Sequence, residues 1–123
     1  MTTQLLVTVI DDDESVRESL PDLLKELGYA AQAFSSAEEF LASEIVEQTR
    51  CLILDIAMPG MTGPELHREL MRRNNNIPVI FVTAQGDEST RPKMLEQGAA
   101  DCLSKPFSDA ALLAALTVAF GVN

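Results

Sequence analysis

Short apolar runs alternate with segments of helical periodicity along the whole chain, and this alternation restricts the fold more than any other feature. A brief apolar run between turn signals is typical of a buried strand, and apolar residues three or four apart are typical of a helix packed on one face. The sequence predicts strands at 5–10, 30–34, 51–54, 79–82 and 100–103. It predicts helices at 15–27, from 36, from 62, at 92–97 and from 108.

The composition of the strands indicates their order in the sheet. The first, third and fourth are nearly continuous apolar runs, as expected for parallel strands covered by helices on both faces. The runs at 30–34 and 100–103 are less apolar and are expected at the edges. Because crossovers between parallel strands are right-handed, we expect an α/β fold with a doubly wound, five-stranded parallel sheet in the order 2-1-3-4-5.

Capping signals set the expected helix ends. Ser36 and Thr62 each lie three residues before a glutamate, which is the spacing of a capping box. Ser108 is expected to cap the last helix, and Gly28 to end the first. Pro92 disfavours helical conformation at the residue before it, so the fourth helix is expected to begin at Pro92.

Charge and apolar content exclude several classes of function. The 123 residues fit one domain, and 19 acidic against 9 basic residues give a net charge of −10, which repels nucleic-acid phosphates. No apolar run approaches a membrane span, and the start of the chain does not resemble a secretory signal. Cys51 and Cys102 lie in apolar stretches and are expected to be buried free thiols, with the cytoplasm as the compartment.

Polar residues stand where the predicted strands end, and open parallel sheets bind ligands beyond those ends. Taken singly, each has a local explanation: acids favour the start of a helix, an aspartate can begin a turn, and a lysine can be solvated. Their joint position at one edge favours a common site. The residues are Asp11 and Asp12 after the first strand, Asp55 after the third, Thr83 after the fourth and Lys105 after the fifth.

This set of groups fits phosphoryl transfer. Clustered carboxylates repel one another unless a cation joins them, and hard oxygen ligands suit Mg²⁺, with Mn²⁺ as the alternative ion. A carboxylate can attack phosphorus to form an aspartyl phosphate, and that transfer needs mainly alignment and charge neutralisation, which Mg²⁺ and a lysine supply. A threonine hydroxyl can then donate a hydrogen bond to the phosphoryl oxygens.

The motifs resemble the response-regulator receiver domain of two-component signalling over the whole chain. They are Asp11-Asp12, "LDIAMPGMTG" (54–63), "PVIFVTA" (78–84) and "GAADCLSKPF" (98–107). The stretches "SSAEEFL" and "VTAQGD" resemble FixJ-like receivers that precede LuxR-type helix-turn-helix domains. The resemblance implies a flavodoxin-like (βα)5 receiver domain over residues 1–123, with an effector domain outside this segment.

The resemblance also implies a role for each acid. Asp55 is the expected phospho-acceptor, and its donor is a sensor histidine kinase. Asp12 is expected to bind Mg²⁺ directly and Asp11 through water, while Asp55 adds a carboxylate oxygen and Ala57 its backbone carbonyl.

On the phosphoryl side, the resemblance implies that Lys105 contacts the phosphoryl group and that Thr83 moves toward it on activation. The Lys105–Pro106 peptide is expected to be cis. Two departures from the family pattern affect how a signal leaves the site. Cys102 stands where relatives often carry a switching Phe or Tyr, and Pro92 lies in the helix that usually rearranges.

The predicted function is a signalling switch and not an enzyme. Phosphorylation is expected to promote homodimerisation through the fourth helix, fifth strand and last helix, and to control transcription through a DNA-binding domain that is not in this segment. The alternative is a stand-alone receiver that acts by protein–protein contact. We expect Ala57 and Gln85 to affect the lifetime of the phosphoryl group.

Two enzyme or cofactor classes are remote alternatives. A haloacid dehalogenase-type phosphatase uses a second acid two residues after the nucleophile, and Ala57 stands there. A flavin-binding domain would replace Asp11-Asp12 with a glycine-rich phosphate loop. His67 lies between Glu65 and Arg68, and we expect it to be an exposed surface residue rather than a phosphotransfer site.

Overall fold

A single parallel sheet forms the centre of the protein in the computed structural model, which describes residues 4–84 and 89–121. Its strand order, β2-β1-β3-β4-β5, confirms the predicted order and the two predicted edges. The elements are β1 (Leu6–Ile10), α1 (Glu14–Glu26), β2 (Ala30–Phe34), α2 (Ala37–Leu41), the 3₁₀ helix η1 (Glu44–Gln48), β3 (Cys51–Asp55), α3 (Gly63–Arg72), β4 (Val79–Thr83), α4 (Thr90–Glu96), β5 (Asp101–Ser104) and α5 (Asp109–Ala119).

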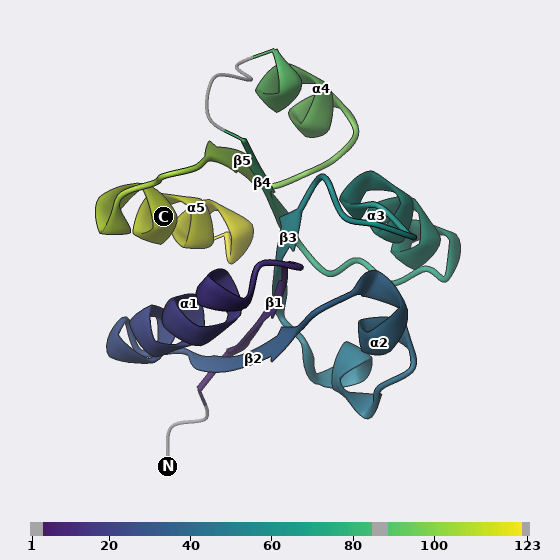
Figure 1. Ribbon diagram of the computed structural model, residues 1–123. Helices are drawn as coiled ribbons and strands as arrows, with labels where there is room; N and C mark the ends of the chain where they lie inside the picture. Colours follow the sequence, from purple (N-terminus) through teal and green to yellow (C-terminus); the bar gives the residue numbers. More distant parts are fainter. Residues whose placement is uncertain (1–3, 85–88, 122–123) are drawn as a thin grey trace.

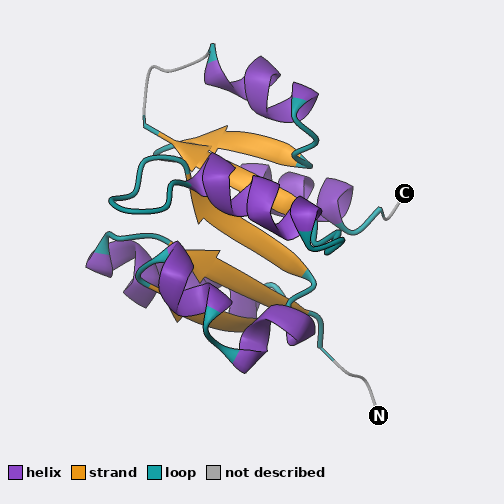
Figure 2. Ribbon diagram, turned by 90° about the vertical axis from the view of Figure 1, so that its right-hand side faces the viewer, coloured by secondary structure: helices purple, strands orange, loops and turns teal. Residues whose placement is uncertain are grey.

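Helices cover both faces of the sheet. Figure 1 shows α1 and α5 on one side and α2 and α3 on the other, and Figure 2 shows the strand arrows pointing the same way. The central strand β3 is buried throughout and serves two cores: Leu52 and Leu54 pack on the side of α2 and α3, and Cys51 and Ile53 on the side of α1 and α5. This two-sided burial explains why its sequence is a continuous apolar run.

Ser36 and Thr62 each cap the start of a helix, as predicted, but only Thr62 completes a capping box. At α3, Glu65 N–H donates to Thr62 Oγ1 at 3.3 Å, and Thr62 N–H donates to the Glu65 carboxylate at 2.9 Å. At α2, Ser36 Oγ accepts from Glu39 N–H at 3.1 Å. The Glu39 carboxylate accepts instead from the hydroxyl of Ser35 at 3.0 Å, so the reciprocal bond is not made there.

The predicted start of the fourth helix was wrong. Helix α4 begins at Thr90, two residues before Pro92. Proline is tolerated there because a backbone N–H in the first helical turn has no partner within the helix. The bias that Pro92 places on its neighbour was therefore outweighed by the position of the proline in the turn.

His67 is buried, which contradicts the prediction of an exposed residue. Only 5% of it is exposed, and its ring packs edge-on against Phe81 with centroids 5.6 Å apart. The buried face of α3 includes Gly63, Leu66 and Leu70 as well as His67. This stripe is wide enough to include position 67 despite the charged residues on either side of it.

Cys51 and Cys102 are buried, as predicted, and they form no disulfide with each other. Across residues 4–84 and 89–121, no helix reaches the length and apolarity that crossing a membrane requires.

Candidate functional site

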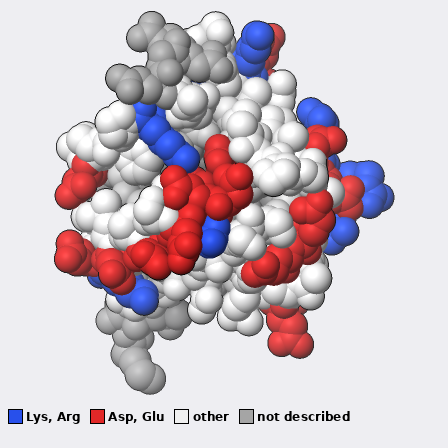
Figure 3. All heavy atoms as spheres, in the orientation of Figure 1, with Lys and Arg blue, Asp and Glu red and all other residues white. Residues whose placement is uncertain are grey.

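The polar residues singled out in the sequence gather at the carboxyl edge of the sheet. Ile10 and Leu54 are partners in the β1–β3 register, so Asp11 and Asp55, the residues that follow them, stand side by side. Asp55 is paired with Val82 in β4, which places Thr83 one residue further along the neighbouring strand. Figure 3 shows acidic side chains concentrated in the middle of this face.

Three carboxylates lie close enough to share one cation. Asp11, Asp12 and Asp55 each offer one oxygen, and these oxygens lie within 4.8 Å of one another. Their chemistry fits a hard divalent ion such as Mg²⁺, which takes one or two carboxylates and keeps several waters. The donor set of this site therefore suits the ion that the sequence predicts.

The environment of Asp55 disfavours its charged form. Burial raises the pKa of Asp55 to about 6, and the neighbouring Asp11 charge contributes to the rise while Lys105 opposes it. A buried carboxylate beside a second carboxylate is stabilised by a nearby cation. The site thus favours the binding of positive charge next to Asp55.

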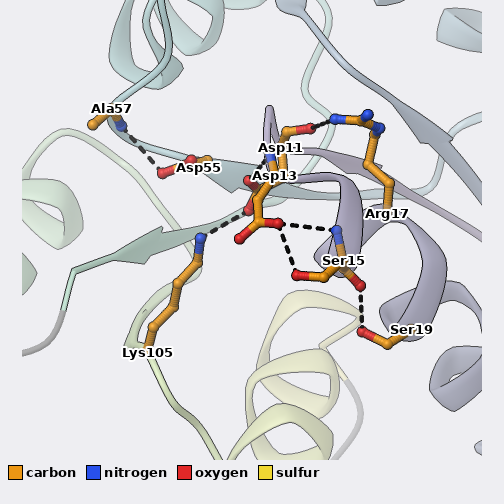
Figure 4. A network of polar contacts seen from close by, with 8 residues as sticks. All are labelled: Asp11, Asp13, Ser15, Arg17, Ser19, Asp55, Ala57 and Lys105. Carbon is orange, nitrogen blue, oxygen red and sulfur yellow. Dashed lines mark hydrogen bonds and ion pairs between the residues drawn. The ribbon is translucent and has the colours of Figure 1, made fainter.

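Both carboxylate oxygens of Asp11 have partners within the protein. Oδ1 accepts from Asp13 N–H at 2.9 Å, and Oδ2 lies 3.1 Å from Lys105 Nζ. The guanidinium of Arg17 donates to the Asp11 backbone carbonyl at 3.0 Å, which fixes the loop from the helix side (Figure 4). Asp12 is exposed, and its carboxylate makes no hydrogen bond to another residue in the described part of the chain.

The four acidic residues after β1, at positions 11–14, have two different structural roles. Asp13 is the N-cap of α1, and its carboxylate accepts from Ser15 N–H at 2.9 Å and from the Ser15 hydroxyl at 2.8 Å. These bonds lower the pKa of Asp13. Glu14 lies in the first helical turn, where an acid favours the helix dipole. The helix-capping explanation therefore applies to Asp13 and Glu14, whereas Asp11 and Asp12 face the site.

Lys105 reaches the site through Asp11. Partial burial works against its charge, but the hydrogen bond to Asp11 and the charges of Asp11 and Asp55 outweigh that effect and raise the pKa of Lys105. Its backbone N–H donates to the Thr83 carbonyl at 2.9 Å, which ties its loop to β4. The Lys105–Pro106 peptide is cis, as predicted. The sequence indicated the position of Lys105 but not its pairing with Asp11.

The segment 56–62 after β3 lies directly against Asp55. Ala57 N–H donates to Asp55 Oδ1 at 3.2 Å (Figure 4). A Cβ atom added to Gly63 would lie 2.4 Å from the Asp55 carbonyl oxygen, so only glycine fits there. This close approach to Asp55 explains why glycine stands at position 63.

Thr83 and Cys102 lie on the strands beyond Asp55, in β4 and β5. Thr83 is the buried last residue of β4, and Cys102 is paired with Phe81 in the β4–β5 register. Cys102 is 4% exposed and belongs to the core beneath α3 and α4. A small thiol is thus packed inward at the position where an aromatic ring is expected. Gln85, the other residue predicted beside the site, lies outside the described residues.

A cavity of about 750 Å³ opens beside these groups. It lies between α1 and the segment that leads into α5, and its walls are mainly apolar. Asp11, Asp55 and Lys105 line its polar end, and Leu20, Leu23 and Phe107 line its apolar wall.

Comparisons with known proteins agree with this geometry. Residues 7–117 match the family model described as the response regulator receiver domain. The chain is 42% identical over 118 residues to Nodulation protein W of Bradyrhizobium diazoefficiens, covering 96% of this chain and 52% of that protein. It is 42% identical over 121 residues to the transcriptional regulatory protein FixJ of Azorhizobium caulinodans, covering 98% of this chain and 57% of that protein.

A solved structure supports the same relationship. The crystal structure of FixJ-N superimposes with a TM-score of 0.86 at 35% identity, covering 99% of this chain and 98% of that one. The chain spans about half the length of the curated relatives it matches. With the sheet order, the acid cluster at its carboxyl edge and these matches in agreement, the chain belongs to the response regulator receiver domain family.

Proposed function

We propose that this domain is a phosphorylation-dependent switch in which Asp55 accepts a phosphoryl group from a sensor histidine kinase. The observation that carries the proposal is the cluster of Asp11, Asp12 and Asp55 oxygens within 4.8 Å of one another. An ammonium group lies 3.1 Å from the same cluster, on Asp11. Carboxylate nucleophile, metal ligands and counter-charge are the parts that phosphoryl transfer to an aspartate needs.

In the transfer step, an Asp55 oxygen forms a bond to phosphorus as the bond from phosphorus to the donor nitrogen breaks. The leaving imidazole keeps the electron pair and takes a proton from solvent. Asp55 must be ionised to attack, and Lys105 moves from Asp11 toward the new phosphoryl oxygens. Bound Mg²⁺ would neutralise the charge that accumulates on those oxygens.

The proposed metal ligands follow from the partners each group already has. Asp12 binds the ion directly because its exposed carboxylate is not engaged by other described residues. Asp11 acts through water because its two oxygens accept from Asp13 N–H and pair with Lys105. Asp55 supplies a carboxylate oxygen, and the backbone carbonyl of Ala57 completes the protein ligands.

The donor is proposed to approach over α1. The cavity beside Asp55 combines an apolar wall with a polar end at the acceptor, which suits apolar side chains of a protein donor that carries the phosphoryl group. A small phosphate donor needs only the polar end. The two buried cysteines form no disulfide with each other, which fits a reducing compartment, and we propose the cytoplasm as the location.

The output is proposed to be transcriptional control. Phosphorylation draws Thr83 toward the acceptor, reshapes the α4–β5–α5 face near Cys102 and promotes homodimerisation there. Relatives of about twice this length include one named a transcriptional regulatory protein, which supports an attached DNA-binding domain. A stand-alone receiver that acts by protein contact is the alternative. We propose no enzymatic turnover, since Ala57 stands where a dehalogenase-type phosphatase carries its second acid.

The test is to incubate the protein with Mg²⁺ and a small acyl phosphate and to measure its intact mass. One phosphoryl adduct is expected in the unsubstituted chain and none in Asp55→Asn. Asp13→Asn is the matched control because Asp13 caps α1, and it should retain the adduct. Equal adduct yield in Asp55→Asn and Asp13→Asn would show that Asp55 is not the acceptor.

A further inference from the structure

Glu38 of α2 contacts the loop of residues 56–62, and the proposed function does not explain this contact. Its Oε2 accepts a hydrogen bond from the backbone N–H of Met61 at 3.0 Å, across 23 positions in the sequence. Met61 lies in the segment 56–62, which follows Asp55 and includes Ala57. An exposed acid on a separate helix is thus joined to the backbone of the loop that borders the site.

The contact is close enough to constrain the loop. A Cβ atom added to Gly60 would lie 2.7 Å from Glu38 Oε2, so the carboxylate lies directly against the loop backbone. Gly60 has φ +75°, the left-handed region that glycine adopts readily. The backbone at Gly60 can therefore approach the Glu38 carboxylate closely, and a side chain at this position would keep the two apart.

Both sides of the contact have firm anchors. Ala37 and Phe40, on either side of Glu38 in α2, are fully buried. Met58 in the loop is 6% exposed and belongs to the same core cluster as these two residues. The Glu38 hydrogen bond therefore links two segments that are already packed together, and it fixes the outer half of the loop relative to the core.

Few other side chains hold this loop. Ile56 N–H donates to the Val82 carbonyl and Gly63 N–H to the Ile56 carbonyl, which close its base. Between these points, the N–H groups of Ala57 and Thr62 donate to carboxylates close by in sequence, those of Asp55 and Glu65. Among the described residues, Glu38 is the side chain distant in sequence that accepts a hydrogen bond from the loop backbone.

We propose that Glu38 is a positioning residue for the acceptor site. By holding Met61, it keeps the loop in the shape that presents the Ala57 backbone to the metal, and so it sets Mg²⁺ affinity without touching the ion. This inference rests on the proposed function, because it assumes that Ala57 supplies a metal ligand. Glu38 acts as a hydrogen-bond acceptor and not through its charge, so glutamine should replace it.

The experiment compares Glu38→Ala, Glu38→Gln and Glu39→Ala in the full chain. Glu39 is the matched control because it lies on the same helix, carries the same charge and bonds to the Ser35 hydroxyl rather than to the loop. Mg²⁺ affinity is measured by titration calorimetry, and protection of the Met61 amide by hydrogen exchange in NMR. Urea unfolding checks that all three variants fold.

Glu38→Ala should weaken Mg²⁺ binding about fivefold, the effect of losing one ordinary hydrogen bond. It should also speed exchange of the Met61 amide. Glu38→Gln and Glu39→Ala should match the unsubstituted chain in both measurements. Unchanged affinity in Glu38→Ala would overturn the proposal, and so would equal weakening in Glu38→Ala and Glu39→Ala, which would indicate a general charge effect.

Failure of the proposed function is distinguishable from failure of this inference. If the unsubstituted chain bound no Mg²⁺ and gained no phosphoryl group, the proposed function and the metal role of Glu38 would fall together. If the unsubstituted chain did both and Glu38→Ala behaved identically, only the role of Glu38 would fall.

Discussion

Lys105 Nζ lies 3.1 Å from Asp11 Oδ2, so the lysine at this site is paired with a carboxylate other than the proposed acceptor. Asp11 is 2% exposed, and its charge is balanced by this ammonium group. A phosphoryl group on Asp55 would compete with Asp11 for the same cation. The lysine is therefore part of a charge balance that changes when phosphate or metal arrives.

Lys105→Met should slow phosphorylation of Asp55 about 100-fold, because the charge on the phosphoryl oxygens then loses a fixed counter-charge. Mg²⁺ binding should be equal or tighter, since the removed ammonium competes with the metal for Asp11. Adduct formation from an acyl phosphate, followed by intact mass across a Mg²⁺ series, measures both effects. Lys93→Met, at an exposed position of helix α4, is the control, and identical rates in the two variants would contradict the prediction.

Asp55→Asn should make the metal-free protein more stable at neutral pH. The pKa of Asp55 is about 6 in the folded protein against an ordinary value of 3.8. Between these two pH values, the folded state keeps a proton on Asp55 that the unfolded state has released. Stability of the unsubstituted chain should therefore fall as pH rises from about 4 to about 6. Asparagine does not ionise, so Asp55→Asn does not lose this stability as pH rises. Asp55→Asn and the unsubstituted chain should therefore differ in unfolding free energy at pH 7 and converge near pH 4.

Urea unfolding at a series of pH values measures this difference. Asp13→Asn is the contrasting variant because hydrogen bonds to Ser15 lower the pKa of Asp13. Its ionised form favours folding, so Asp13→Asn should give no gain in stability at pH 7. A gain of equal size in both variants would point to the loss of net negative charge rather than to the burial of Asp55.

The sheet and the position of the site were predictable because they depend on local patterns. Buried runs mark the strands, and Asp11 and Asp55 directly follow two of them, so the topology alone brings them together. The pairing of Lys105 with Asp11 and of Glu38 with Met61 depends on side-chain positions across segments distant in sequence. No spacing rule encodes those contacts. His67 was mispredicted because its charged neighbours suggested a surface, whereas the width of the buried stripe on α3 decided its place.

Gly63→Ala should destabilise the protein and displace Asp55 through steric overlap. The added Cβ would lie 2.4 Å from the Asp55 carbonyl oxygen, which forces the backbone of β3 or the start of α3 to move. The expected cost is about 1–3 kcal/mol of unfolding free energy, with slower phosphorylation of Asp55.

Gly28→Ala separates overlap from backbone strain. Gly28 has φ +99° and no atom within 4 Å of an added Cβ, so alanine there costs conformational strain of about 1 kcal/mol without a collision. Urea unfolding and the adduct assay apply to both variants. Equal loss of stability, with phosphorylation unaffected in Gly63→Ala, would show that the loop relaxes around the added methyl group.

His67→Leu should remove part of the acid sensitivity of the fold. Burial, with a smaller effect from the charge of Arg68, lowers the pKa of His67 below its ordinary 6.5. As pH falls through 6.5, His67 takes up a proton in the unfolded chain but not yet in the folded chain, so the free energy of unfolding decreases. The stability advantage of His67→Leu should therefore grow from pH 8 to pH 5.

The comparison is clean because the chain has one histidine. The contribution of Asp55 has the opposite sign in part of this range, but it is common to both proteins and cancels in their difference. Urea midpoints at pH 5, 6, 7 and 8 give that difference. A constant gap across the series would mean that His67 takes up its proton as readily in the folded state as in the unfolded one.

Cys102→Phe tests whether the core can hold the aromatic ring that the family usually carries. Cys102 is 4% exposed and shares its core cluster with Phe81 and Met94, so a phenyl ring pointing inward overpacks the region by about 1–3 kcal/mol. If movement of Thr83 toward a phosphorylated Asp55 makes room for the ring, phosphorylation should restore part of that loss. Urea unfolding before and after acyl phosphate treatment measures the restoration.

Cys102→Ala is the control, since a smaller side chain should cost similar stability in both states. Equal stabilisation of Cys102→Phe and Cys102→Ala on phosphorylation would mean that no space opens beside β5, and that the signal leaves this domain by a route other than an inward-turning ring.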